Sequence, residues 1–248
     1  MKQILLYFAL TSMAWTMMSC KTQNLFVDKS RTQSKTDSIF AYNPNYQHSI
    51  RVDDKVNISV WGQEDMSIGS VYGIYNSNEV YGKWLLVDAR GEISVPRIGE
   101  MKVTGMTVPQ LKDTLRTLVG KWVQNPIVDV KIMNKEITLL GEFRNPAVVH
   151  VDKDNNSLLE MVAKVGGFEF YADLTKVRVL RNGPDGKVKM AKLDLTASGD
   201  IAMVNLQLHP GDVIIAPSKK HKDFDKRIST IIPFASSATA AAILLGAF

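Results

Sequence analysis

Apolar and polar residues alternate in the part of the chain that follows residue 50, which is typical of strands with one buried face. The apolar members of the first such stretch are Val52, Val56, Ile58 and Val60. Three further runs, at 85–87, 93–95 and 127–132, also predict strands. The runs before and after Gly91 are expected to pair as a hairpin, because glycine adopts the positive φ that a tight turn requires.

The spacing changes at Thr107, where apolar residues begin to recur every three or four positions. They are Val108, Leu111, Leu115, Leu118, Val119 and Trp122. Thr107 and Gln110 have the spacing of a capping box, and Pro109 suits the first turn of a helix. The pattern therefore predicts an amphipathic helix that packs one face on the sheet.

A second group of elements follows the predicted helix. Its predicted strands are 137–143, 147–151, 177–180, 188–193 and 213–215. Turn sequences join the first two pairs of these strands into hairpins. Ser157 and Glu160 have another capping-box pattern, and Gly166 with Gly167 is a typical helix end. The chain is therefore predicted to be α/β mixed (α+β), with two small mixed-sheet domains joined near residues 133–136.

The first 19 residues are typical of a secretory signal, in which one charged residue, Lys2, precedes an apolar run. Ser19 and Cys20, the only cysteine, complete a sequence that resembles the lipobox of bacterial lipoproteins. Acyl chains on the thiol and amine of Cys20 are expected to anchor the mature chain, since several chains give stable membrane binding. No acidic residue follows Cys20 directly, which favours the outer membrane. Residues 20–45 are polar and are predicted to form a flexible, lipidated tether.

Residues 228–248 contain no charged side chain. As a helix they would extend about 30 Å, the hydrocarbon thickness of a bilayer. The basic stretch before them, 219–227, is expected to lie at anionic headgroups. The candidate pore-lining residues of this predicted membrane-spanning helix are Ser229, Thr230, Ser236 and Ser237. A buried C-terminal helix of a soluble domain, or an unstructured tail, is the alternative interpretation.

The charge and the candidate catalytic residues exclude several functions. A formal net charge of +5 is too small, and basic residues too rarely alternate with aromatic ones, for a nucleic-acid-binding protein. The histidines are far apart and match no metal motif, so no metal, cofactor or catalytic residue is predicted, and His209 is interpreted as an ordinary loop residue. Two adjacent carboxylate pairs, Asp53 with Asp54 and Glu64 with Asp65, should point to opposite faces of a strand. They are therefore interpreted as solvated charges and not as a glycosidase pair.

Two sets of turn and helix-start motifs occur in an order that is specific to one family. The first set comprises residues 87–99, Gly105-Met106-Thr107 and Asn125-Pro126-Ile127-Val128. The second set comprises residues 141–146, Gly166-Gly167-Phe168 and residues 208–214. On these residues the chain resembles the Wza-type polysaccharide biosynthesis/export family, with one polysaccharide-export domain and one soluble-ligand-binding β-grasp (SLBB) domain. Asp53 stands where that family usually has a glycine before the first strand, which affects only a turn.

The resemblance divides the chain into five segments. They are a lipoprotein signal peptide (1–19), the lipidated tether (20–45), the polysaccharide-export domain (46–134), the β-grasp domain (135–218), and the basic collar with the membrane-spanning helix (219–248). The resemblance implies a homo-oligomeric ring in the outer membrane, anchored at Cys20, with its folded domains in the periplasm. An inner-membrane polysaccharide copolymerase would supply the polymer.

The resemblance implies transport and not catalysis. The ring would export capsular or exopolysaccharide through a channel that the C-terminal helices line. Candidate polymer contacts are Tyr72, Tyr75, Tyr81 and Trp84. Aromatic rings stack on sugars, although packing in a core or an interface is the alternative role for these side chains. In a second interpretation the chain has the same two domains but forms no channel. It would then be a non-conducting outer-membrane lipoprotein adaptor whose β-grasp domain binds a ligand or an envelope partner.

Overall fold

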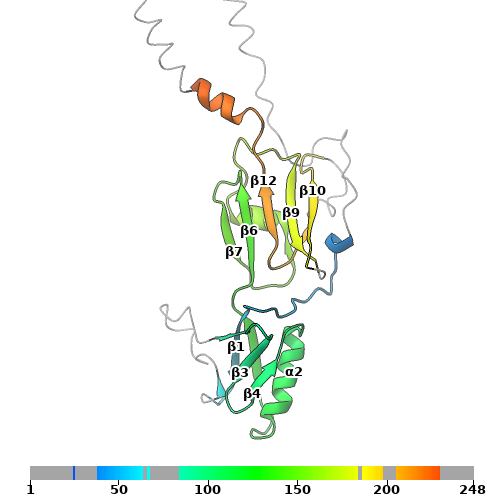
Figure 1. Cartoon of the computed structure of the whole chain (residues 1–248), viewed down its shortest axis with the longest axis vertical. Coiled ribbons are helices and arrows are strands. Elements are labelled where there is room, and N and C mark those ends of the chain that lie inside the picture. The colour runs from blue at the N-terminus through cyan, green and yellow to red at the C-terminus, as the bar shows by residue number, and fades with distance from the viewer. Residues whose placement is uncertain are drawn as a thin grey trace, which may run out of the picture.

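The computed structural model describes residues 25, 38–63, 66–67, 84–183, 186–197 and 205–229. These residues form two domains that lie end to end along the long axis of the molecule (Figure 1). Each domain has its own cluster of buried apolar side chains. The mixed α/β class predicted from the sequence is confirmed.

In the first domain a helix covers one face of a small sheet. Its strands are β1 (Lys55–Val60), β2 (Leu85–Leu86) and β5 (Val128–Ile132). β1 lies between the other two and pairs with both in antiparallel orientation. Val56, Ile58 and Val60 point to the buried face of β1, as their alternation predicts.

Helix α2 (Val108–Val119) confirms the predicted amphipathic helix. The N–H of Gln110 donates to the Thr107 side chain, and the N–H of Thr107 donates to the Gln110 side chain, so the capping box is complete. The buried side chains of the helix are Leu111, Leu115 and Val119. They pack in the same cluster as the buried residues of β1 and β5.

The predicted hairpin around Gly91 is wrong, because the strand after the turn has a different partner. β3 (Glu92–Val95) pairs with β4 (Gly99–Lys102), whereas β2 pairs with β1. Asp88 closes the turn on itself, since its carboxylate accepts two backbone N–H groups. β3 then folds back on β4 through Arg97, which has a positive φ of 63°.

Asp53, which replaces the glycine expected from the family pattern, adopts a glycine-like conformation. Its φ is 69°, in the left-handed region that favours glycine. Asn134 holds this turn, because its side-chain amide donates to the Asp53 carbonyl (3.0 Å) and accepts the N–H of Lys55 (2.8 Å). The end of β5 is thereby tied to the start of β1.

The second domain is built on a five-stranded sheet in the order β10-β9-β12-β6-β7. The strands are β6 (Glu136–Gly141), β7 (Ala147–His150), β9 (Val177–Asn182), β10 (Val188–Leu193) and β12 (Val213–Ala216). β12 pairs with β6 in parallel and all other neighbours are antiparallel, so both predicted hairpins and the last strand are confirmed. Helix α3 (Leu158–Lys164) packs on one face of the sheet and lies behind it in Figure 1. The short strands β8 (Asn156–Ser157) and β11 (Gln207–Leu208) pair beside the start of α3.

Local signals set both ends of α3. The Ser157 side chain accepts the N–H of Glu160, as the capping pattern predicts. Gly166 and Gly167 have φ values of 81° and 91°, and the N–H of Gly167 donates to the Val162 carbonyl at 3.0 Å. This closure of the last turn satisfies a carbonyl that would otherwise lack a partner at the end of the helix.

A short helix, residues 222–229, follows β12 at the far end of the second domain (Figure 1). No helix among the described residues combines the length and the apolar character needed to cross a bilayer. The predicted membrane-spanning segment, 228–248, lies outside the described residues apart from its first two, so it stays a prediction.

Candidate functional site

The segment before the first domain, residues 38–49, lies along the second domain, and we call it the strap. It starts with a 3-10 turn, Ser38–Phe40, whose Phe40 side chain is buried in the core of the second domain. Asn43 forms two hydrogen bonds with Gln207: its N–H donates to Oε1 (2.8 Å) and its carbonyl accepts from Nε2 (3.0 Å). The last part of the predicted tether is thus packed against one domain before the chain enters the other.

A buried ion pair lies against the strap. Arg181 on β9 donates from Nε and Nη2 to the two carboxylate oxygens of Asp212, at 2.9 and 2.6 Å. Its Nη1 and Nη2 also donate to the carbonyls of Ile39 and Gln207, both at 2.8 Å. Burial raises the pKa of Asp212 and the guanidinium opposes that shift, but the two-point contact is that of an ionised carboxylate. Arg181 therefore links β9, the strap and the turn before β12.

An aromatic stack joins this turn to the strap. The rings of Tyr46 and His209 are parallel, with 3.6 Å between their centroids and 3° between their planes. Burial and, after it, the charges of Arg181 and Arg51 lower the pKa of His209 to about 3. Burial also raises the pKa of Tyr46 to about 12. Both rings are therefore uncharged near neutral pH, which suits a packed aromatic contact.

The first domain contributes Arg51 to the junction between the domains. Its Nη1 donates to the carbonyl of Pro210 at 3.3 Å, and its backbone N–H donates to the Asp54 carboxylate at 2.8 Å. Asp54 also contacts Nε2 of His48 at 3.2 Å and is only 8% exposed. The interpretation of Asp54 as a solvated charge is therefore wrong, because a tight turn folds its carboxylate back onto the backbone of Arg51.

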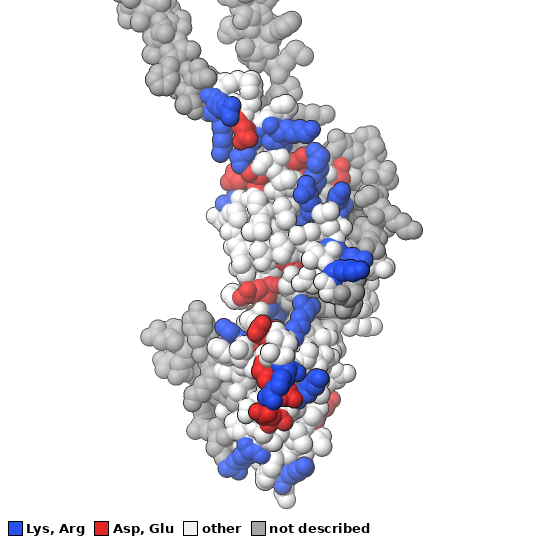
Figure 2. Space-filling view, in the orientation of Figure 1, with Lys and Arg blue, Asp and Glu red and all other residues white. Residues whose placement is uncertain are grey.

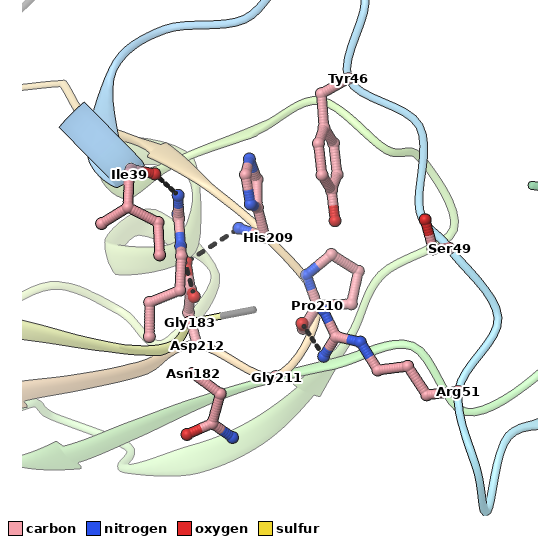
Figure 3. Close-up of a pocket in the computed structure, with 11 residues that line it drawn as sticks. Ile39, Tyr46, Ser49, Arg51, Asn182, Gly183, His209, Pro210, Gly211 and Asp212 are labelled. Carbon is pink, nitrogen blue, oxygen red and sulfur yellow. Dashed lines mark hydrogen bonds and ion pairs between the residues drawn. The ribbon is translucent and has the colours of Figure 1, made fainter. Parts of the chain in front are cut away.

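A cavity of about 540 Å³ lies between the strap, the turn before β12 and the first domain (Figure 3). Its lining consists of Ile39, Tyr46, Ser49, Arg51, Arg181, Asn182, Gly183, His209, Pro210, Gly211 and Asp212. In Figure 3, Tyr46, Ser49 and Arg51 lie on the chain segment that faces the turn containing His209 and Pro210. Hydroxyl, amide and guanidinium groups around a volume of this size can hold a small polar molecule.

The junction is poorly suited to acid–base chemistry. His209 has a pKa far below neutral, and Asp212 is engaged by Arg181 on both carboxylate oxygens. Within the described part of the chain, no group of three or more His, Cys, Asp or Glu residues is placed to hold a metal ion. The arrangement can position the two domains and bind a polar molecule between them.

Two family models match consecutive parts of the chain. Residues 42–133 match the model described as polysaccharide biosynthesis/export protein, and residues 135–216 match the SLBB domain. The chain belongs to the Wza-type polysaccharide export family. We therefore call the first domain the export domain and the second the SLBB domain.

Curated proteins similar to this chain are named as polysaccharide export outer membrane proteins. The chain is 27% identical over 205 residues to the EPS I polysaccharide export outer membrane protein EpsA of Ralstonia solanacearum, a match that covers 75% of this chain and 53% of that protein. It is 25% identical over 178 residues to the capsule polysaccharide export outer membrane protein CtrA of Neisseria meningitidis serogroup B, which covers 67% of this chain and 43% of that protein. The chain thus spans about half the length of these relatives.

The predicted site residues do not meet at the junction. Those outside the described residues are Cys20, Tyr72, Tyr75, Tyr81, Thr230, Ser236 and Ser237. Trp84 lies just before β2, is 38% exposed, and has the Nζ of Lys55 at 4.5 Å from its ring centroid. Ser229 is the last described residue of the 222–229 helix, where its hydroxyl donates to the Lys226 carbonyl at 2.8 Å.

Sequence reasoning missed the residues that do meet there. The interpretation of His209 as an ordinary loop residue is incomplete, because the ring stacks on Tyr46 of the strap. Arg181 and Asp212 come together only when β9 and β12 pair, so each resembles a solvated charge in the sequence. One local signal was available: Ile39 and Phe40 are adjacent large apolar residues within the predicted tether.

Proposed function

We propose that this chain is a subunit of a homo-oligomeric outer-membrane channel that exports capsular or exopolysaccharide from the periplasm to the cell surface. The observation that carries the proposal is the consecutive match of an export domain and an SLBB domain. The curated relatives named as polysaccharide export outer membrane proteins favour the same role. The proposed substrate is therefore the polysaccharide itself, in transit and chemically unchanged.

The attachment of the 222–229 helix to the SLBB domain supports a channel whose membrane part follows that helix. Lys222 forms an ion pair with Glu142 at the end of β6 and lowers the pKa of that carboxyl. The Ser218 hydroxyl donates to the same carboxylate at 2.8 Å. These contacts attach the start of the 222–229 helix to the SLBB domain, and the uncharged segment, 230–248, follows that helix in the sequence.

Both proposed membrane attachments connect to the same domain. The strap, which follows the proposed acylation site at Cys20, packs on the SLBB domain through Phe40. The proposed membrane helix follows residue 229, beyond β12 of that domain. We therefore place the SLBB domain next to the outer membrane and the export domain deeper in the periplasm, where an inner-membrane copolymerase would meet it.

Removal of residues 228–248 tests the channel against the adaptor alternative. We expect the shortened protein to be acylated and folded, with an unchanged melting temperature, while polysaccharide disappears from the cell surface. Normal surface polysaccharide would contradict the channel and favour an adaptor. A matched control replaces the segment by an unrelated uncharged membrane helix. It restores a spanning segment but should not restore export, because the proposed pore-lining residues Ser229, Thr230, Ser236 and Ser237 are gone.

The tyrosines before β2 form a separate proposal. Replacement of Tyr72, Tyr75 and Tyr81 by alanine should reduce the rate at which polymer reaches the surface, since each aromatic face that contacts a sugar ring is lost. The melting temperature should stay unchanged. A large fall in melting temperature would assign these side chains to packing.

A further inference from the structure

The cavity between the strap, the turn before β12 and the export domain has an unpaired positive charge in its wall. Arg181 and Asp212 neutralise each other through their ion pair. His209 is uncharged near neutral pH, since its pKa is lowered to about 3. Arg51 is the remaining charged residue of the lining, and its guanidinium forms no ion pair within the described part of the chain. The cavity is therefore suited to an anionic group.

The turn before β12 is shaped to admit this guanidinium. Nη1 of Arg51 donates to the carbonyl of Pro210 at 3.3 Å. Gly211, the next residue, has a φ of 90°, and a Cβ built on it would lie 3.0 Å from the same Nη1. A side chain at this position would thus be strained and would crowd the guanidinium. The other N–H groups of Arg51 have no partner among the described side chains, and their planar arrangement fits a carboxylate.

Groups that bind hydroxyls lie beside this charge in the lining. Tyr46 and Ser49 contribute hydroxyl groups from the strap, and Asn182 contributes an amide from the end of β9. None of these three side-chain groups is hydrogen-bonded to another described residue. Burial raises the pKa of Tyr46 to about 12, so its hydroxyl keeps the proton that it can donate. In Figure 3 this hydroxyl points from the strap toward the turn that holds Pro210.

His209 adds a polar atom that lacks a partner. Its Nε2 is buried and forms no hydrogen bond within the described ranges, whereas its backbone N–H donates to Asp212 at 2.9 Å. Nearly all buried polar atoms in proteins are hydrogen-bonded, either to the protein or to a bound molecule. The stack on Tyr46 also holds the ring in one orientation. This part of the lining favours an occupant with hydroxyl groups over an apolar one.

We propose that this cavity binds one sugar unit that carries a carboxylate, with its carboxylate on Arg51 and its ring hydroxyls on Tyr46 and Asn182. The inference rests on the proposed function, because the exported polysaccharide is the source of such units. A volume of about 540 Å³ is within the range of about 300–1,000 Å³ that small-molecule sites occupy. A neutral sugar would leave the charge of Arg51 unpaired, and an inorganic anion would leave the hydroxyl and amide groups unused.

Occupancy of the cavity joins three parts of the chain. Arg51 belongs to the export domain, Tyr46 and Ser49 belong to the strap, and Asn182 belongs to the SLBB domain. A ligand that contacts all three should slow the local opening by which the strap leaves the SLBB domain. Binding therefore has a second readout besides affinity, which is protection of the strap and of the 209–212 turn from hydrogen exchange.

The test measures binding of glucuronate at pH 7 to the full-length acylated protein, extracted in a detergent without a sugar headgroup. Saturation-transfer NMR gives the affinity, and hydrogen exchange gives the location. The comparison probes are glucose, which has a hydroxymethyl group in place of the carboxylate, and inorganic phosphate, which has the charge without the ring. We expect glucuronate to bind at least tenfold more tightly than either probe and to protect residues 46–51 and 209–212.

Two variants and a matched control locate the contacts. Arg51→Ala should weaken glucuronate binding at least tenfold, to the affinity of glucose, because it removes the charge that selects the carboxylate. Ser49→Ala removes one hydroxyl from an exposed strap residue and should weaken the binding of both sugars by about two- to tenfold. This variant decides the question if Arg51→Ala alters the junction itself. Arg116→Ala, at an exposed guanidinium on α2, is the control and should bind glucuronate like the wild type.

The outcomes separate this inference from the proposed function. Equal binding of glucuronate and either probe, binding that survives in both variants, or no binding, with water as the occupant, would overturn the site. Protection confined to other parts of the chain would overturn it as well. If the site fails while removal of residues 228–248 still abolishes surface polysaccharide, the channel proposal stands. Binding that depends on Arg51, with normal surface polysaccharide after that removal, would support the site and contradict the channel.

Discussion

The two domains differ in how far each is complete within its own stretch of sequence. The export domain draws its buried cluster from Ile50 to Ile132, and β1 and β5 present polar residues on the open side of its sheet. The SLBB domain takes Phe40 from the strap into its core and leaves an apolar sheet face open. The comparison teaches that a domain boundary in sequence is not a boundary in packing, because the SLBB domain needs a segment from before the export domain.

The largest expected effect of a single substitution is at the buried ion pair of the SLBB domain. Arg181→Ala leaves the Asp212 carboxylate, 1% exposed, without its partner and should destabilise the domain by about 3–5 kcal/mol. Hydrogen exchange of β9 and β12 amides would report the loss. Tryptophan fluorescence should change little, because Trp61, Trp84 and Trp122 are all in the export domain. An equal loss of stability in the export domain would show that the two domains do not unfold independently.

Removal of the strap's anchor should have a similar but smaller effect. Phe40→Ala empties a site in the SLBB core where the ring is 3% exposed and should cost about 3 kcal/mol. Tyr42→Ala, at a strap side chain that is 66% exposed, is the matched control and should change stability little. Proteolysis within residues 38–49 should become faster in the Phe40 variant only. Unchanged protection of the strap would show that its packing does not depend on Phe40.

Elements that depend on neighbouring residues could be predicted from the sequence, whereas contacts between distant segments could not. Helix α2 and the hairpins of the SLBB domain were predictable, because a capping box and short turns are encoded by neighbouring residues. The partner of β3 and the parallel pairing of β12 with β6 depend on contacts between distant segments, which periodicity does not specify.

The junction was less predictable than the fold for the same reason. Tyr46 and His209 are brought together by the strap, and each has a polar or turn-like sequence environment. The pKa of His209 follows from this burial and not from its sequence neighbours. A contact between the strap and a turn that is distant in sequence cannot be predicted from the residues next to either one.

Acid should weaken the SLBB domain through His209. Its pKa is lowered from 6.5 to about 3 on folding, so the unfolded chain binds the proton more tightly. The stabilisation is full above pH 6.5 and is lost as the pH falls from 6.5 toward 3. His209→Phe should keep the stack on Tyr46 and flatten the dependence of SLBB stability on pH in this window. Urea titrations at pH 7 and pH 4.5 give the free energy of unfolding at each pH. If this free energy falls by the same amount in His209→Phe as in the wild type, His209 is not the source of the pH dependence.

The smallest expected effect lies in the export domain. Thr107→Ala removes the side-chain acceptor for the Gln110 N–H and should cost about 1 kcal/mol. The loss should appear in tryptophan fluorescence and leave hydrogen exchange of the SLBB sheet unchanged. Thr107→Ser retains the hydroxyl and serves as the control. A transfer of the destabilisation to the SLBB domain would show that the two domains unfold together.

Electron microscopy of the acylated, detergent-extracted protein tests the proposed channel most directly, since rings and their central openings are visible in single particles. We predict closed rings of identical subunits with a central opening and with the SLBB domains at the end that carries the detergent. Isolated particles with the dimensions of one chain, or assemblies that enclose no opening, would contradict a conduit for polysaccharide.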